Sequence, residues 1–290
     1  MTLRRTTAPT VPVRDGHWLD WGGSGPPLHF AHGNGFPPAT YRKLIEVLRE
    51  GAHVASMEAR PLWPGSDPRS LSNWPELARD LKQELERRGL RGSVGVGHSL
   101  GAVITLLAAA EDPRLFKAVV AIDPVVLAGW TSSLWGTMKT VGVGDRLPLV
   151  RGARNRRRHF PDRDAARAAY RHRRMFRAWD EETLDDYLAH ALVPAPDGGL
   201  TLRYPRSWEA RIFRLSPHNV WPQLRRLQVP TLFIQGEHSD SFSSTAVIKV
   251  LREVPGARVS LFKGYGHCVP MECPESVGET ILEFLEETSI

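Results

Sequence analysis

One serine in this sequence stands in the setting of a reactive nucleophile. Gly97-His98-Ser99-Leu100-Gly101 fits the pattern G-x-S-x-G. A β-type run at 94–96 precedes it and a small apolar run at 102–110 follows, so the expected order is strand, tight turn and helix. Glycines let the strand and the helix approach closely, which presents the Ser99 hydroxyl at the tip of the turn. The amide groups at the start of the helix can stabilise an oxyanion beside it.

A serine hydroxyl reacts at neutral pH only when an imidazole accepts its proton and a carboxylate orients that imidazole. In a parallel α/β sheet, such groups follow strands at the same edge. Asp240 follows the strand-like residues 231–235, and His267 lies in a glycine-flanked loop after a strand that ends at Phe262. The order Ser99, Asp240, His267 is the one expected on such a sheet. We therefore predict a triad of these three residues.

Two other carboxylates compete with Asp240 for this role. Asp123 directly follows a predicted strand, and Glu237 becomes the acid if the register of its loop differs. The five-residue pattern by itself also fits a serine that only caps a helix. The histidine and the acid therefore decide between chemistry and capping.

The loop after a predicted strand at 28–31 supplies the second part of an oxyanion site. His32-Gly33-Asn34-Gly35 follows that strand, and we assign the backbone N–H groups of Asn34 and Leu100 as the oxyanion donors. His32 is expected to support the loop, because its place is far from that of the expected base. We expect the substrate pocket to be lined by Gly33, Phe36, Trp63 and His98.

The composition indicates a globular protein with enough apolar residues for a sizeable core. The chain has 290 residues, of which 41% are hydrophobic, and no apolar run reaches the roughly 18 residues of a membrane span. Its start lacks the apolar segment of a signal peptide, and its two cysteines are no disulfide framework, so we expect a cytoplasmic protein without stable membrane insertion. No motif indicates a metal or a cofactor, and none is expected.

The net charge of +6 comes largely from arginines between Arg146 and Arg177. The cluster Arg154–Arg158 lacks interleaved aromatic residues and any nucleic-acid-binding motif, which favours a solvated basic face over a nucleic-acid partner. One helix is expected over 163–179, with its arginines on the solvent side and Met175, Phe176 and Trp179 on the other.

Strands alternate with helices along most of the chain, which predicts a mostly parallel sheet flanked by helices. The alternation stops for about a hundred residues after Pro124 and resumes at Pro230. We predict a core domain formed by 1–124 and 229–290, with a helical cap inserted at 125–228. Residues 1–10 are expected to form a loose tail.

These motifs together resemble the α/β-hydrolase fold superfamily, in its capped form with a serine nucleophile. The resemblance rests on His32-Gly33, the pattern around Ser99, Gly236 with Asp240, and Gly266-His267, and it covers about 11–124 and 229–288. The sequence departs from the family where a D-x-R-G type loop is usual, because it reads Glu58-Ala-Arg-Pro-Leu-Trp63 there. The cap, where this family selects its substrates, has no matching motif.

The resemblance implies a hydrolase that forms an acyl-enzyme on Ser99. Carboxylic esters with small or medium acyl groups are the expected substrates, and amide, lactone or carbon–carbon bond hydrolysis would use the same residues. A non-catalytic binding protein on this scaffold is the alternative of another class, and a complete triad argues against it.

Overall fold

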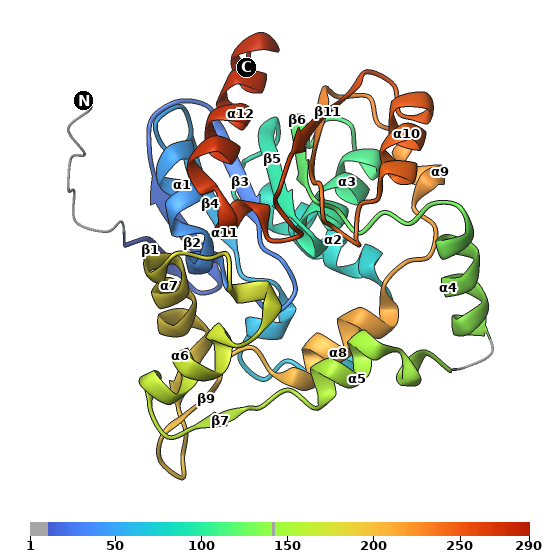
Figure 1. Cartoon of the computed structure of the whole chain (residues 1–290). Coiled ribbons are helices and arrows are strands. Elements are labelled where there is room, and N and C mark those ends of the chain that lie inside the picture. Colours follow the sequence, from blue (N-terminus) through green and yellow to red (C-terminus); the bar gives the residue numbers. More distant parts are fainter. Residues whose placement is uncertain (1–10, 141–142) are drawn as a thin grey trace.

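An eight-stranded sheet forms the centre of the computed structural model, which describes residues 11–140 and 143–290 (Figure 1). The expected N-terminal tail at 1–10 lies outside the described residues. The strands lie in the order β1, β2, β4, β3, β5, β6, β10 and β11. In chain order, their bounds are Val13–Asp15 (β1), Trp18–Gly22 (β2), Pro27–Ala31 (β3), His53–Met57 (β4), Ser93–His98 (β5), Phe116–Ile122 (β6), Thr231–Gly236 (β10) and Ala257–Phe262 (β11). From β4 to β11 all neighbours are parallel, while β1 and β2 form an antiparallel hairpin on β4. The predicted fold class is confirmed.

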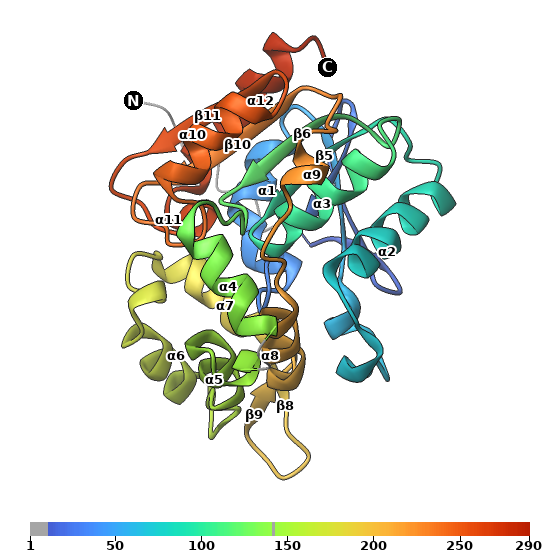
Figure 2. The ribbon, with the colours of Figure 1, turned by 90° about the vertical axis from the view of Figure 1, so that its right-hand side faces the viewer.

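Helices cover both faces of this sheet, as its parallel strands require. The apolar core divides into two clusters, one on each face. Alternate residues of β6 belong to opposite clusters, with Val119 and Ala121 in one and Ala118 and Val120 in the other. One face packs against α1 (Arg42–Leu48) and α12 (Pro274–Glu287), and the other against α2 (Trp74–Arg87), α3 (Leu100–Glu111) and α10 (Ser244–Glu253) (Figures 1 and 2).

The segment between β6 and β10, which we call the insert, is mainly helical and lies beyond the carboxyl ends of the parallel strands (Figure 2). It also contains a small antiparallel sheet, in the order β7, β9, β8, that the sequence pattern did not predict. Within the described part of the chain, no helix is long and apolar enough to cross a membrane. The elements of the insert are α4 (Trp130–Thr140), α5 (Pro148–Arg154), β7 (His159–Phe160), α6 (Arg163–Arg171), α7 (Glu181–Ala191), β8 (Leu192–Pro194), β9 (Leu200–Leu202), α8 (Arg206–Leu215) and α9 (Trp221–Leu224).

The predicted helix over 163–179 is shorter in the structure. It ends at Arg171, and the backbone of Arg173 is extended, with φ −85° and ψ 132°. This break turns Phe176 inward against Tyr187, at a ring distance of 5.1 Å, and leaves Met175 exposed. Aromatic packing in the insert therefore outweighs the helical period of the sequence.

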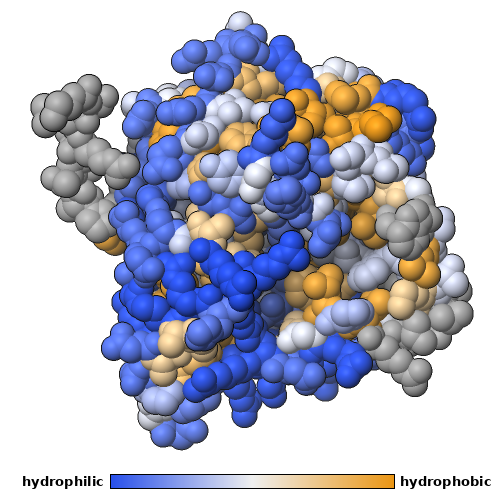
Figure 3. Space-filling model, in the orientation of Figure 1, coloured by the Kyte–Doolittle hydropathy of each residue, from blue (hydrophilic) through white to orange (hydrophobic). Residues whose placement is uncertain are grey.

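The arginines on α6 are held by acidic residues of the neighbouring helix. Arg167 and Arg171 both pair with Glu181, at 2.9 Å and 2.5 Å, and Arg167 also pairs with Asp185. The surface over this part of the insert is largely hydrophilic (Figure 3). The predicted solvent-facing arginine stripe is therefore partly neutralised, because arginines of α6 pair with carboxylates of α7.

Gly101 provides a test of how closely α3 approaches the sheet. A Cβ atom at this position would lie 2.0 Å from the carbonyl oxygen of Ala31 and 2.7 Å from that of His32. Because both neighbours are backbone atoms, we expect Gly101→Ala to lower the free energy of unfolding by at least about 3 kcal/mol, measured by urea denaturation.

Gly152 is the matched control, because it also lies in a helix but nothing is within 4 Å of its added Cβ. Gly152→Ala should be neutral or stabilising, by up to about 1 kcal/mol. Equal stability of the Gly101 variant and the wild type would contradict the close approach described here.

Candidate active site

Ser99 lies on a sharp turn between β5 and α3. Its backbone has φ 55° and ψ −113°, a region that non-glycine residues rarely adopt. The two flanking glycines make the turn possible, because a Cβ on Gly97 would lie 2.5 Å from the backbone of Gly101. The side chain consequently stands at the start of α3, where the first N–H groups of a helix have no partner within it.

His267 and Asp123 complete a hydrogen-bonded row with Ser99. His267 Nε2 lies 3.0 Å from Ser99 Oγ, and His267 Nδ1 lies 2.6 Å from Asp123 Oδ2. Asp123 is fully buried, whereas the His267 side chain is 24% exposed. Since the carboxylate can only accept, His267 Nδ1 carries a proton and Nε2 faces the serine hydroxyl as an acceptor. This is the tautomer that a general base for Ser99 needs.

The acid beside the histidine is therefore Asp123, and the predicted pairing of His267 with Asp240 is wrong. Strand β6 lies between β5 and β10, so its last residues are next to the serine turn. The end of β10 and the loop after it support Asp123 from the other side, through the Gly236 N–H at 3.1 Å and the Ser239 hydroxyl. Asp240, one residue further on, is exposed.

Glu237, the other alternative, is also exposed and accepts a hydrogen bond from the Gly264 N–H at 2.8 Å. Glu237 therefore supports the loop that carries His267. Among the described residues, no contact joins it to the His267 ring. The sequence signal for Asp123 was its place directly after a buried strand. The end of that strand fixes where the residue lies, without an intervening loop whose conformation is unknown. Asp240 lies four residues beyond its strand, so its direction depended on the loop.

The oxyanion loop is tied to the insert by the side chain of Asn34. Asn34 Nδ2 donates to the carbonyl of Glu209 at 3.2 Å, and Asn34 Oδ1 accepts from the Tyr204 hydroxyl at 2.8 Å. The Asn34 side chain is thus occupied with holding the loop, and the predicted oxyanion role concerns its backbone N–H alone. Leu100 opens α3, so its N–H belongs to the first turn of that helix.

His32 fastens the same loop to the neighbouring strand. Its Nε2 accepts from the Ala59 N–H at 3.0 Å, and its Nδ1 donates to the Gly33 carbonyl at 2.9 Å. Burial lowers the pKa of His32, so the ring stays neutral and structural. This agrees with the supporting role expected from its position.

The similarity of the chain to known proteins spans both halves of the sheet. Residues 30–280 match the alpha/beta hydrolase family. The chain belongs to this family.

Relatives of the hydrolase carry the names of several hydrolytic activities. It is 27% identical over 230 residues to esterase YbfF of Escherichia coli, a match that covers 77% of this chain and 79% of the esterase. It is 24% identical over 279 residues to an sn-1-specific diacylglycerol lipase of Mus musculus, covering 92% and 83% of the two chains. A crystal structure of E-2-(acetamidomethylene)succinate hydrolase matches with a TM-score of 0.77 at 24% identity, over 93% of this chain and 94% of that one, which reflects a common fold.

The four residues expected to line the substrate pocket have different surroundings in the hydrolase. Phe36 lies 7% exposed among aromatic residues of the insert, 5.7 Å from Trp179 and 5.8 Å from Tyr187 between ring centroids. Trp63 packs on His17, at 4.7 Å, and therefore faces the β1–β2 turn. Gly33 and His98 are buried, with His98 fully so, 4.9 Å from the ring of His267.

A buried arginine of the insert lies against the oxyanion loop, a feature the sequence analysis missed. Arg156, expected on a solvated basic face, has a side chain that is only 8% exposed and pairs with Glu209 at 2.7 Å. It also donates to the hydroxyls of Tyr170 and Tyr187. Burial opposes its charge, yet Tyr187 and Glu209 hold the pKa of Arg156 well above its usual value. Its Nη1 would lie 3.4 Å from a Cβ at Gly35, so the pair sits directly on the loop.

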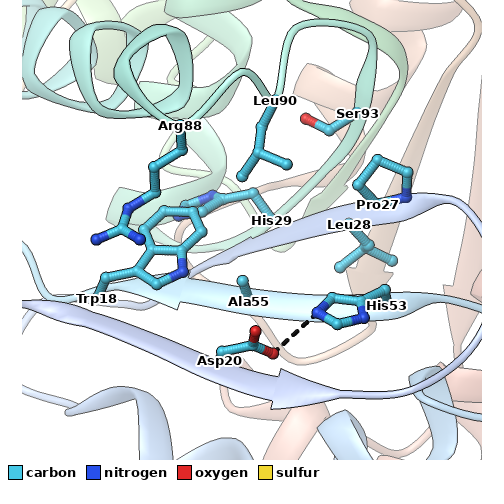
Figure 4. A pocket seen from close by; sticks show the side chains of 10 residues that line it. All are labelled: Trp18, Asp20, Pro27, Leu28, His29, His53, Ala55, Arg88, Leu90 and Ser93. Carbon is cyan, nitrogen blue, oxygen red and sulfur yellow. Dashed lines mark hydrogen bonds and ion pairs between the residues drawn. The ribbon is translucent and has the colours of Figure 1, made fainter. Parts of the chain in front are cut away.

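A separate pocket of about 170 Å³ lies at the opposite edge of the sheet, near the starts of β3, β4 and β5 (Figure 4). Arg88 stacks over Trp18 on one side of it, at 4.4 Å, and Asp20 pairs with His53 at 2.9 Å on another. None of the residues that line it belongs to the row at Ser99. Across residues 11–140 and 143–290, no three or more His, Cys, Asp or Glu side chains form a group that could hold a metal ion.

The geometry makes opposite predictions for the two aspartates. Asp123→Asn should reduce kcat for p-nitrophenyl butyrate by about 10⁴-fold, because the amide favours the wrong histidine tautomer. Asp240→Asn, an exposed change of the same size, should leave kcat within about twofold of the wild type. A large loss in the second variant with none in the first would restore the assignment of Asp240.

The Arg156–Glu209 pair predicts an effect on stability. Arg156→Met would leave the Glu209 carboxylate buried without its cation, and we expect a loss of about 3–5 kcal/mol in the free energy of unfolding. Arg158→Met is the control, because Arg158 is exposed two residues further along the sequence and should change stability by less than about 0.5 kcal/mol. Urea unfolding of both variants measures the difference, and similar losses would show that the pair has no special role.

Proposed function

We propose that this protein is a serine hydrolase of carboxylic esters that works through an acyl-enzyme on Ser99. The observation that carries the proposal is the hydrogen-bonded row from Ser99 through His267 to the buried Asp123. A helix cap needs no imidazole at its hydroxyl, and a binding protein needs no buried carboxylate behind that imidazole. Ser99 has both the imidazole and the buried carboxylate behind it, which favours a nucleophile over either alternative.

In the first half of the reaction, His267 Nε2 takes the proton of Ser99 as Oγ attacks the acyl carbon. The carbonyl oxygen becomes an oxyanion, which the backbone N–H groups of Asn34 and Leu100 are proposed to receive. Collapse of this intermediate breaks the bond to the alcohol, which leaves with the proton from His267 Nε2. Asp123 stabilises the imidazolium in between.

In the second half, a water molecule takes the place of the alcohol. His267 Nε2 removes one of its protons as the oxygen attacks the acyl carbon, and the second intermediate collapses to the free acid. The proton then returns to Ser99 Oγ, which restores the starting state. The overall change is one ester and one water converted to one acid and one alcohol.

Esters of small or medium acyl groups are the proposed substrates. Two of the relatives described above are named as an esterase and as a diacylglycerol lipase, and both names denote ester cleavage. The third protein, named for a substrate with an acetamido group, keeps amide hydrolysis as the second candidate reaction. Lactone and carbon–carbon bond hydrolysis would use the same three side chains.

Replacement of the nucleophile tests the proposal directly. Ser99→Ala should lose p-nitrophenyl butyrate hydrolysis by at least about 10⁴-fold while unfolding at the wild-type temperature or above, because a strained turn hydroxyl adds little to packing. Ser72→Ala, at an exposed serine on the chain before α2, is the control and should be fully active.

A fluorophosphonate provides a second measurement that does not depend on the choice of ester. It should add one phosphonyl group to the wild type, at Ser99, and none to Ser99→Ala, as seen by mass spectrometry. Equal activity in wild type and Ser99→Ala would show that Ser99 is not the nucleophile. Neither activity nor labelling in the wild type would favour a binding protein.

A further inference from the structure

A buried chain of three hydrogen bonds joins the three loops of the candidate active site. The Gly33 N–H donates to the Tyr41 hydroxyl at 2.9 Å, and that hydroxyl lies 2.8 Å from His98 Nδ1. His98 Nε2 in turn lies 2.8 Å from the backbone carbonyl of His267. Tyr41 and His98 are 1% and 0% exposed, so the chain is closed to solvent.

The direction of each hydrogen bond follows from the chemistry of the two ends. The His267 carbonyl can only accept, so His98 Nε2 must carry a proton. Burial, and after it the closeness of the His267 imidazole, lowers the pKa of His98 well below its ordinary value, so the ring is neutral and its Nδ1 is an acceptor. The Tyr41 hydroxyl, whose pKa burial raises, therefore donates to Nδ1 and accepts from the Gly33 N–H. Every donor in the chain has one acceptor.

Three members of this chain of hydrogen bonds are, or directly precede, residues of the proposed chemistry. Gly33 directly precedes Asn34, the expected oxyanion donor, and His98 directly precedes Ser99. The last acceptor of the chain is the backbone carbonyl of His267 itself. The relative positions of the proposed base, nucleophile and oxyanion donor thus depend on two side chains that are themselves closed to solvent.

The glycine at position 33 follows from the same arrangement. A Cβ there would lie 2.9 Å from the Tyr41 hydroxyl and 3.0 Å from His98 Nδ1. The space that a side chain would take is filled by the tyrosine and histidine. This explains on geometric grounds why residue 33 is a glycine.

We propose that Tyr41 and His98 are positioning residues. They fix the positions of three loops relative to one another: the oxyanion loop at Gly33-Asn34, the serine turn and the loop of His267. The inference rests on the proposed function, because it assigns these residues a part in the hydrolysis. A loose link would leave substrate binding unchanged but misalign the donors at the moment when charge forms on the acyl oxygen. Such misalignment lowers kcat and leaves KM unaltered.

Three variants separate positioning from simple packing. Tyr41→Phe keeps the ring, which packs on Phe30 at 4.7 Å, and removes only the hydroxyl. His98→Leu removes both arms of the chain, and His98→Gln retains an N–H that can reach the His267 carbonyl. We expect kcat for p-nitrophenyl butyrate to fall about tenfold in Tyr41→Phe and about a hundredfold in His98→Leu, with KM within twofold of the wild type. His98→Gln should recover part of the loss.

The double variant Tyr41→Phe/His98→Leu tests whether the two residues act as one unit. Because His98→Leu already breaks the chain, the second change should cost little more, so the two losses should not add. Unchanged kcat in all single variants, with only the unfolding temperature lowered, would reduce both residues to packing. Fully additive losses would also overturn the proposal.

Nuclear magnetic resonance of ¹⁵N-histidine-labelled and ¹⁵N-glycine-labelled protein tests the chain without any substrate. In the wild type, His98 should stay in its Nε2–H tautomer from about pH 5 to about pH 9. Tyr41→Phe should move the signals of His98 Nδ1 and of the Gly33 amide. An Nδ1–H tautomer, or a Gly33 signal insensitive to Tyr41, would overturn the inference even if no ester is hydrolysed. Conversely, the expected spectra in a protein that fails to react with a fluorophosphonate would reject the proposed function alone.

Discussion

One buried carboxylate governs the arrangement of the active-site edge. Asp123 has no exposed surface, and an unpaired charge there would be very costly. It is satisfied by three donors from two segments: the Gly236 N–H and the Ser239 hydroxyl at and just after the end of β10, and His267 Nδ1 after β11. Satisfying this charge thus brings the ends of β6, β10 and β11 together.

Backbone strain accompanies the same arrangement. Of the three non-glycine residues with positive φ among the described residues, two are Ser99 and Asp123. Close contacts between backbones keep them there, because Gly97 lies on Gly101 and Gly236 lies on Gly266, where any Cβ would clash. The glycines of these motifs therefore have a mechanical role, because they hold Ser99 and Asp123 in conformations that an isolated peptide would avoid.

The sequence made the sheet, the serine turn and the histidine loop predictable because their signals are local. A strand followed by G-x-S-x-G and a small apolar helix carries its own geometry, and Ser99 and His267 do meet. The acid was not local in this sense, because Asp123 and Asp240 both follow strands of the sheet. The position of β6 between β5 and β10 decides between them, and strand order is a property of the whole fold.

The insert shows the opposite limit of sequence patterns. Its arginines were grouped by their nearness in the sequence, yet Arg156 finds its partner Glu209 across 53 residues and turns inward. The helical period over 163–179 was likewise a poor guide, since the aromatic side chains around Tyr187 end the helix early. Partners that decide burial lie on other elements, and the period of one segment does not record them.

The hydrogen bonds between the insert and Asn34 have a consequence for any attempt to exchange the insert. Glu209 and Tyr204, which hold the oxyanion loop, belong to the insert and not to the sheet. Grafting a foreign insert onto this scaffold would therefore remove two anchors of the loop that carries Asn34. A chimera would have to keep Tyr204 and the backbone carbonyl of Glu209, so the insert and the loop that carries Asn34 cannot be exchanged independently of each other.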